Sequence, residues 1–173
     1  MAEERARNPN LISPASMTAM ASTAGSGKEL MSEIFTKVNN AKVKADKIAV
    51  LKRNDTQAMR MILKGAFDPK IEWDLPPGIP PFIKNEVPEG TQHTWLENES
   101  RRLYNFVKGG NNQLNKIKKE TLFIQILEGL HYKEAEVLID VKNGTLNKTY
   151  KGLTSEVVKE AFNWNAEFAK PAE

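Results

Sequence analysis

Apolar residues recur three and four positions apart along most of this chain, which is the spacing of one face of an α-helix. The first such stripe contains Leu30, Ile34, Phe35 and Val38. Polar or glycine-containing turns separate one stripe from the next, and strand-like alternation is confined to residues 71–75. The pattern therefore predicts an all-α protein, a compact bundle of about six to seven helices.

Helix start and stop signals divide the pattern into segments. We expect Asn54 or Asp55 to cap the third helix, and Thr154 or Ser155 to cap the last one. Pro69 should end the third helix, because proline disfavours a helical conformation in the residue before it. The predicted helices cover about 28–40, 43–53, 55–67, 92–107, 112–129, 132–142 and 155–162.

Composition shifts suggest one domain with flanking segments. Residues 1–27 are rich in Ala, Ser, Thr, Met and Asn, and we expect them to form a flexible N-terminal arm. Residues 28–165 form the single helical domain, and 166–173 form a C-terminal tail. Five of the nine prolines lie between residues 76 and 88, so 76–90 is predicted to be a Pro-rich loop. Connections of this length in compact domains tend to be functional or mobile.

The chain offers little that could support catalysis. It has no cysteine, so it can form neither a thiol nucleophile nor a cysteine-based metal site, and its two histidines have no metal-ligand companion at helical spacing. His93 and His131 are interpreted as solvated or capping residues. The Gly-Ser-Gly-Lys string at 25–28 lacks the first glycine and the final Ser or Thr of a phosphate-binding loop. We therefore predict no enzyme activity, no catalytic or metal site and no cofactor.

Charge is distributed unevenly, although the net charge is only +3. Residues 37–70 hold nine basic residues against three acids, 101–119 hold six basic residues and no acid, and 142–151 hold three basic residues and no acid. Residues 72–99 instead hold six acids and one lysine. Each basic segment alone is typical of a solvated helix face, but three converging segments could contact phosphates.

Glycines at two of these basic segments would let backbone amides approach a phosphate closely. The sequence thus predicts binding of duplex DNA through its backbone, with weak sequence specificity and steep salt dependence. The predicted DNA-binding residues are Lys108, Gly109, Gly110, Lys116, Lys118, Lys142, Asn143, Gly144, Lys148, Lys151 and Gly152.

Two stretches resemble the N-terminal helical DNA-binding domain of ATP-dependent DNA ligases. One comprises residues 41–55 with the Met-Ile-Leu-Lys-Gly-Ala-Phe-Asp-Pro run at 61–69, and the other comprises residues 135–144 with 153–162. The resemblance implies that the second stretch forms a helix, a glycine turn at Gly144 and a helix, which approach the DNA backbone in the minor groove. The ligase hairpin has no counterpart of Thr145–Lys151, and the Lys-x-Asp-Gly motif of the ligase nucleotidyl lysine is absent.

Residues 33–163 also resemble an uncharacterised family of small proteins from tailed, myovirus-type marine phages. That resemblance implies a phage-encoded protein in the host cytoplasm. Our first hypothesis is a non-catalytic DNA-binding accessory protein. The alternative is a virion-associated or protein-interaction component that binds phage or host proteins through residues 1–27 and the Pro-rich loop. A third hypothesis, an enzyme, would need a cleft that brings a histidine against several carboxylates. No apolar run approaches the about 20 residues of a bilayer span, so no membrane association is predicted.

Overall fold

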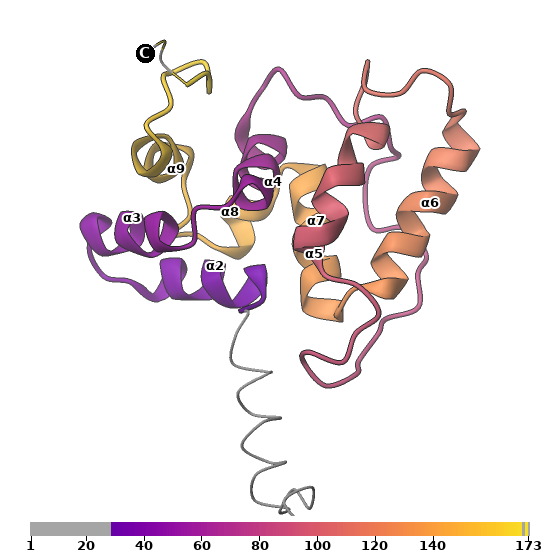
Figure 1. Cartoon of the computed structure of the whole chain (residues 1–173), viewed down its shortest axis with the longest axis horizontal. Helices are drawn as coiled ribbons and strands as arrows, with labels where there is room; N and C mark the ends of the chain where they lie inside the picture. Colours follow the sequence, from indigo (N-terminus) through magenta and orange to yellow (C-terminus); the bar gives the residue numbers. More distant parts are fainter. Residues whose placement is uncertain (1–28, 171, 173) are drawn as a thin grey trace, which may run out of the picture.

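The computed structural model describes residues 29–170 and 172, and its regular secondary structure is helical, which confirms the predicted all-α class (Figure 1). Among these residues no strand forms, and residues 71–75 contribute only an isolated antiparallel bridge between Trp73 and Val107. The helices are α2 (Met31–Asn40), α3 (Lys44–Arg53), α4 (Gln57–Phe67), α5 (Leu96–Glu99), the 3-10 helix η2 (Ser100–Phe106), α6 (Lys116–Gly129), α7 (Tyr132–Asn143), α8 (Leu146–Thr149) and α9 (Ser155–Phe162).

Helix α7 is the central element of the bundle. It packs against α2 and α4 on one side and against α6 on the other, while α3 packs on α9 at the edge (Figure 1). Ala135 and Leu138 of α7 are fully buried, as are Phe35 of α2 and Ile62 of α4. These residues belong to the apolar stripes of the sequence, and burying them is what drives the helices together.

Helix boundaries agree with the predictions at some positions and differ at others. Thr154 caps α9, as predicted, by accepting a hydrogen bond from the Val157 amide. The predicted cap of the third helix was wrong, because the Thr56 hydroxyl, rather than Asn54 or Asp55, accepts from the Met59 amide at 3.1 Å. The segment predicted as one helix over 92–107 begins only at Leu96 and continues as the 3-10 helix η2. Helix α6 begins at Lys116, four residues later than predicted.

The folded region extends beyond the predicted boundary at residue 165. Phe168, assigned to the tail, is 2% exposed and packs against Trp164 with ring centroids 6.0 Å apart. Lys159 lies over the Phe168 ring at 4.7 Å from its centroid. The predicted arm at 1–27 lies outside the described residues. No helix in the described part of the chain is long and apolar enough to cross a bilayer.

One buried carboxylate joins three helices at their N-terminal ends. Glu134, in the first turn of α7, accepts hydrogen bonds from the amides of Met31 at the start of α2 and Leu96 at the start of α5. Its burial raises the pKa of Glu134, although the two amide hydrogen bonds act in the opposite direction. The first amides of a helix have no acceptor within it, so Glu134 supplies one to each neighbouring helix.

The Pro-rich loop lies against α6 and α7 and is fixed to both. The Ile83 amide donates to the Glu128 carboxylate of α6 at 3.1 Å, and the Asn85 carbonyl accepts from the Tyr132 amide of α7 at 3.1 Å. Lys84 pairs with Glu136 of α7 at 3.4 Å. The loop is therefore an integral layer of the fold.

Candidate nucleic-acid interface

The first turn of α6 carries exposed lysines at the positive end of a helix. The Asn115 side chain caps the helix by accepting from the Lys118 amide at 2.8 Å. Lys116 and Lys118 are exposed and make no ion pair among the described residues, and Ile117 between them is 76% exposed. The first turn contains no acid. Positive charge is unfavourable at the N-terminus of a helix, where the helix dipole is also positive. The turn is therefore suited to bind an anion.

The next lysine of the same run has a structural role. The ammonium of Lys119 lies 2.7 Å from the Asp74 carboxylate, its side chain is only 6% exposed, and this contact lowers the pKa of Asp74. The Asp74 amide donates in turn to the Phe106 carbonyl at 2.7 Å. Asp74 thus anchors the start of α6 to η2, and Lys119 is not available to a phosphate.

The loop before α6 supplies three more of the predicted residues. Lys108 is exposed, but its ammonium pairs with Glu72 at 2.6 Å, so a phosphate would have to compete with that carboxylate. Gly109 has a φ of +80° and open space around it. A side chain at Gly110 would overlap the Tyr104 carbonyl, so this glycine permits a close approach of two backbone segments. The local backbone conformation therefore explains why glycine occupies both positions.

The end of α7 differs from what the sequence suggested. Lys142 is 8% exposed, and its ammonium donates to the carbonyls of Pro76 at 2.8 Å and Gly78 at 2.9 Å. The Asn143 side chain donates to the Gly78 carbonyl at 3.0 Å and accepts from the Gly78 amide at 3.3 Å. Burial lowers the pKa of Lys142. Both side chains hold the Pro-rich loop, and the buried Lys142 ammonium is not available to DNA.

Gly144 ends α7 in the left-handed conformation, with a φ of +68°. Its amide donates back to the Val141 carbonyl at 3.3 Å, and the Thr145 amide donates to the Asp140 carbonyl at 2.9 Å. The Asp140 carboxylate accepts from the Thr145 hydroxyl at 2.7 Å. The turn amides are therefore satisfied within the turn, and the glycine serves as a helix cap.

The segment without a counterpart in the ligase hairpin folds as the short helix α8. Lys148 and Lys151 are exposed there and make no ion pair within the described ranges. The Gly152 amide donates to the Asn39 side chain at 2.9 Å, and a side chain at Gly152 would overlap the Lys47 ammonium. The third basic segment thus lies beside the turn between α2 and α3, which belongs to the first basic segment.

The structure brings parts of all three basic segments towards one end of the α6–α7 pair. Two residues connect α6 to α7, so the two helices run antiparallel, and the start of α6 lies at the same end as Gly144. Helices α6 and α8 lie on opposite sides of α7 (Figure 1). Lys108, Lys142, Asn143 and Gly144 line one cavity of about 470 Å³ between the ends of α4 and α7. Two helix C-termini face this cavity, and their partial negative charge disfavours a phosphate there.

Of the predicted residues, the exposed lysines without an ion-pair partner in the described part of the chain are therefore Lys116, Lys118, Lys148 and Lys151. The predicted set did not include Lys47 of α3, whose ammonium lies beside Gly152, or the exposed Lys42 in the α2–α3 turn. The lysine-rich composition of 37–70 was the signal, but it could not indicate which lysine lies beside Gly152.

The two histidines differ in exposure and in role. His131 is 3% exposed and caps α7 by accepting from the Lys133 amide at 3.2 Å, which confirms the capping interpretation. His93 is exposed. No group of three or more His, Asp or Glu side chains able to hold a metal ion occurs within residues 29–170.

Comparison with known proteins yields one match. Residues 34–148 match the model of a family described as a family of unknown function (DUF6433). No curated protein and no solved structure matches the chain.

Proposed function

This chain belongs to the DUF6433 family, and we propose that it is a non-catalytic accessory protein that binds duplex DNA through the phosphate backbone. The observation that carries the proposal is the first turn of α6. Lys116 and Lys118 are exposed there and have no ion-pair partner among residues 29–170, and they lie at the positive end of a 14-residue helix whose first turn has no acid. A phosphate would neutralise charges that otherwise oppose the helix dipole.

Lys148 and Lys151 extend the proposed contact surface beyond α7. Because the ligase hairpin has no counterpart of this segment, the use of Lys148 and Lys151 is supported by their exposure and charge and not by that resemblance. We do not include Lys142 and Asn143 among the proposed DNA-binding residues, because both side chains donate hydrogen bonds to the Gly78 carbonyl. Contacts of this kind carry no sequence information, so specificity should be weak.

Resemblance to small proteins of tailed phages supports a phage-encoded origin and action in the host cytoplasm. The proposal does not depend on that origin. DNA binding by a basic helix end uses only charges present in the chain.

A salt titration of duplex binding tests this function. The logarithm of affinity should fall with the logarithm of salt concentration by about 0.9 for each contacted phosphate. The double variant Lys116→Gln with Lys118→Gln should reduce that slope by about two. The matched control is Lys70→Gln with Lys133→Gln, which removes the same charge from lysines paired with Glu167 and Glu89. Absence of duplex binding at about 50 mM salt, or equal losses in both variants, would exclude the proposal.

A second candidate is a virion-associated or protein-interaction component. The exposed isoleucines of the Pro-rich loop, Ile79 and Ile83, favour it. Under this alternative, deleting residues 1–27 should abolish partner capture, whereas DNA binding through α6 should survive the deletion.

A further inference from the structure

Two isoleucines of the Pro-rich loop are the most exposed large apolar side chains among the described residues. Ile79 is 78% exposed and Ile83 is 79% exposed. The backbone around them is held in place, since Gly78 bonds to Asn143 and the Ile83 amide bonds to Glu128. Exposed apolar side chains on a fixed backbone are typical of interaction surfaces, because little conformational entropy is lost on binding.

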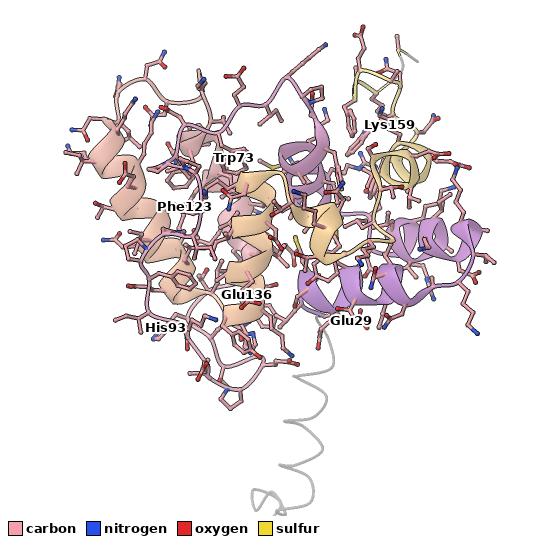
Figure 2. The ribbon with its side chains drawn as sticks, turned by 180° about the vertical axis from the view of Figure 1, so that it is seen from behind. Glu29, Trp73, His93, Phe123, Glu136 and Lys159 are labelled. Carbon is pink, nitrogen blue, oxygen red and sulfur yellow. The ribbon has the colours of Figure 1, made fainter. Side chains whose placement is uncertain are left out.

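A hollow lies on each side of Ile79. One, of about 240 Å³, is walled by Phe123 and Ile124 of α6 with the prolines of the loop. The other, of about 280 Å³, is walled by Phe82 of the loop and by Val137 and Ile139 of α7 among others. Phe123 and Glu136, which line one hollow each, are labelled in Figure 2. Both volumes are below the about 300–1,000 Å³ typical of small-molecule sites, so they suit aliphatic side chains of a protein.

The rim of this surface carries both signs of charge. Lys84 and Glu136 lie 3.4 Å apart beside the larger hollow, and Glu120 lies at the smaller one. A partner surface that is only positive or only negative would place a charge of the same sign against either Lys84 or the glutamates. A second copy carries both signs at the same rim, so an arrangement about a two-fold axis can pair Lys84 with Glu136 of the partner subunit, and it offers isoleucines to hollows of the same shape.

We propose that the Pro-rich loop is a self-association surface, on which the Ile79 and Ile83 side chains of one copy enter the hollows beside Ile79 of a second copy. The surface contains both the projecting side chains and the hollows that receive them, which is what an isologous two-fold interface requires. The proposal is independent of DNA binding, and its test contains no DNA, so each can fail without the other.

Sedimentation equilibrium of the full chain, at concentrations up to about 100 µM, tests the proposal. The wild-type chain should show a mass that rises with concentration towards that of a dimer. The variant with Ile79→Asp and Ile83→Asp should associate at least about thirtyfold more weakly, because it places charges in an apolar interface. Val43→Asp is the matched control, since Val43 is also exposed, at 54%, but precedes α3.

Charge reversal at the rim gives a second, independent measurement. Lys84→Glu should weaken association, and adding Glu136→Lys should restore it. A monomeric wild-type chain across the whole range would overturn the proposal. So would association of the double aspartate variant with wild-type strength, or an equal loss in Val43→Asp. Thermal unfolding of each variant verifies that these exposed substitutions leave the fold intact.

Discussion

The Lys142 ammonium donates to the Gly78 carbonyl at 2.9 Å, which ties the end of α7 to the Pro-rich loop across 64 positions of sequence. The same ammonium donates to the Pro76 carbonyl at 2.8 Å. A lysine that sequence reasoning assigned to DNA is therefore a structural cation near a helix C-terminus, where the carbonyl groups favour a positive charge.

Replacement of this cation should loosen the loop. Lys142→Met should lower the free energy of unfolding by about 1.5–3 kcal/mol, the range of hydrogen bonds made by a charged group. Urea unfolding at neutral pH measures this loss. Lys148→Met, which changes an exposed lysine without an ion pair among the described residues, should leave stability within about 0.5 kcal/mol of wild type. Equal stability of the two variants would contradict the structural role of Lys142.

Glu134 should give the stability a specific pH dependence. Its pKa in the folded protein is raised by burial, so the folded state binds a proton more tightly than the unfolded chain does. The stabilising contribution of this proton is complete below the ordinary pKa of about 4.3 and is lost as the pH rises through the higher folded-state pKa. Relative to Glu134→Gln, which does not titrate, the wild-type chain should therefore lose stability as the pH rises from about 4 to 7.

Urea unfolding of both proteins across that range measures the difference. A constant difference would show that the pKa of Glu134 is the same in both states. Glu134→Ala is a separate variant that leaves the amides of Met31 and Leu96 without their acceptor. It should cost at least about 2 kcal/mol at any pH, because each unsatisfied buried group costs about 1–3 kcal/mol.

Neighbouring glycines in the loop before α6 should respond differently to alanine. Gly110→Ala forces a β-carbon into the Tyr104 carbonyl and should destabilise the protein by about 3 kcal/mol or more. The β-carbon of Gly109→Ala would meet no atom within 4 Å. This substitution should lower the free energy of unfolding by only about 1–2 kcal/mol, the cost of placing alanine in a left-handed conformation. Thermal unfolding compares the two, and the reverse order would mean that the loop adopts another path.

Gly144→Ala separates the two roles of the glycine turn. If the glycine is only a helix cap, alanine should cost about 1–2 kcal/mol of stability and leave the salt slope of DNA binding unchanged. Anisotropy titration of duplex DNA, at a temperature where the variant is fully folded, checks the second part. A reduced slope would show that the turn amides contact phosphate.

Helix content followed from local sequence, because the 3.6-residue period of apolar residues and the capping side chains act within a few residues of each other. Thr154 was recognised in this way as one of two candidate caps, with Ser155 as the other. The start of α6 was missed because Asn115, the residue that caps it, follows a polar stretch with no distinctive period. The burial of Phe168 was missed because its partner Trp164 and the lysine above it form a contact visible only in three dimensions.

What the sequence alone determined is the all-α class, the positions of most helices and the uneven distribution of charge. Only the tertiary structure decided which lysines remain available to contact a phosphate. Lys119 and Lys142 have the same side chain as Lys116 and Lys118, but they face Asp74 and the Pro-rich loop, from residues 45 and 66 positions earlier in the chain. A lysine's availability depends on the acceptors near its ammonium, and those acceptors come from distant segments that meet only when the chain folds.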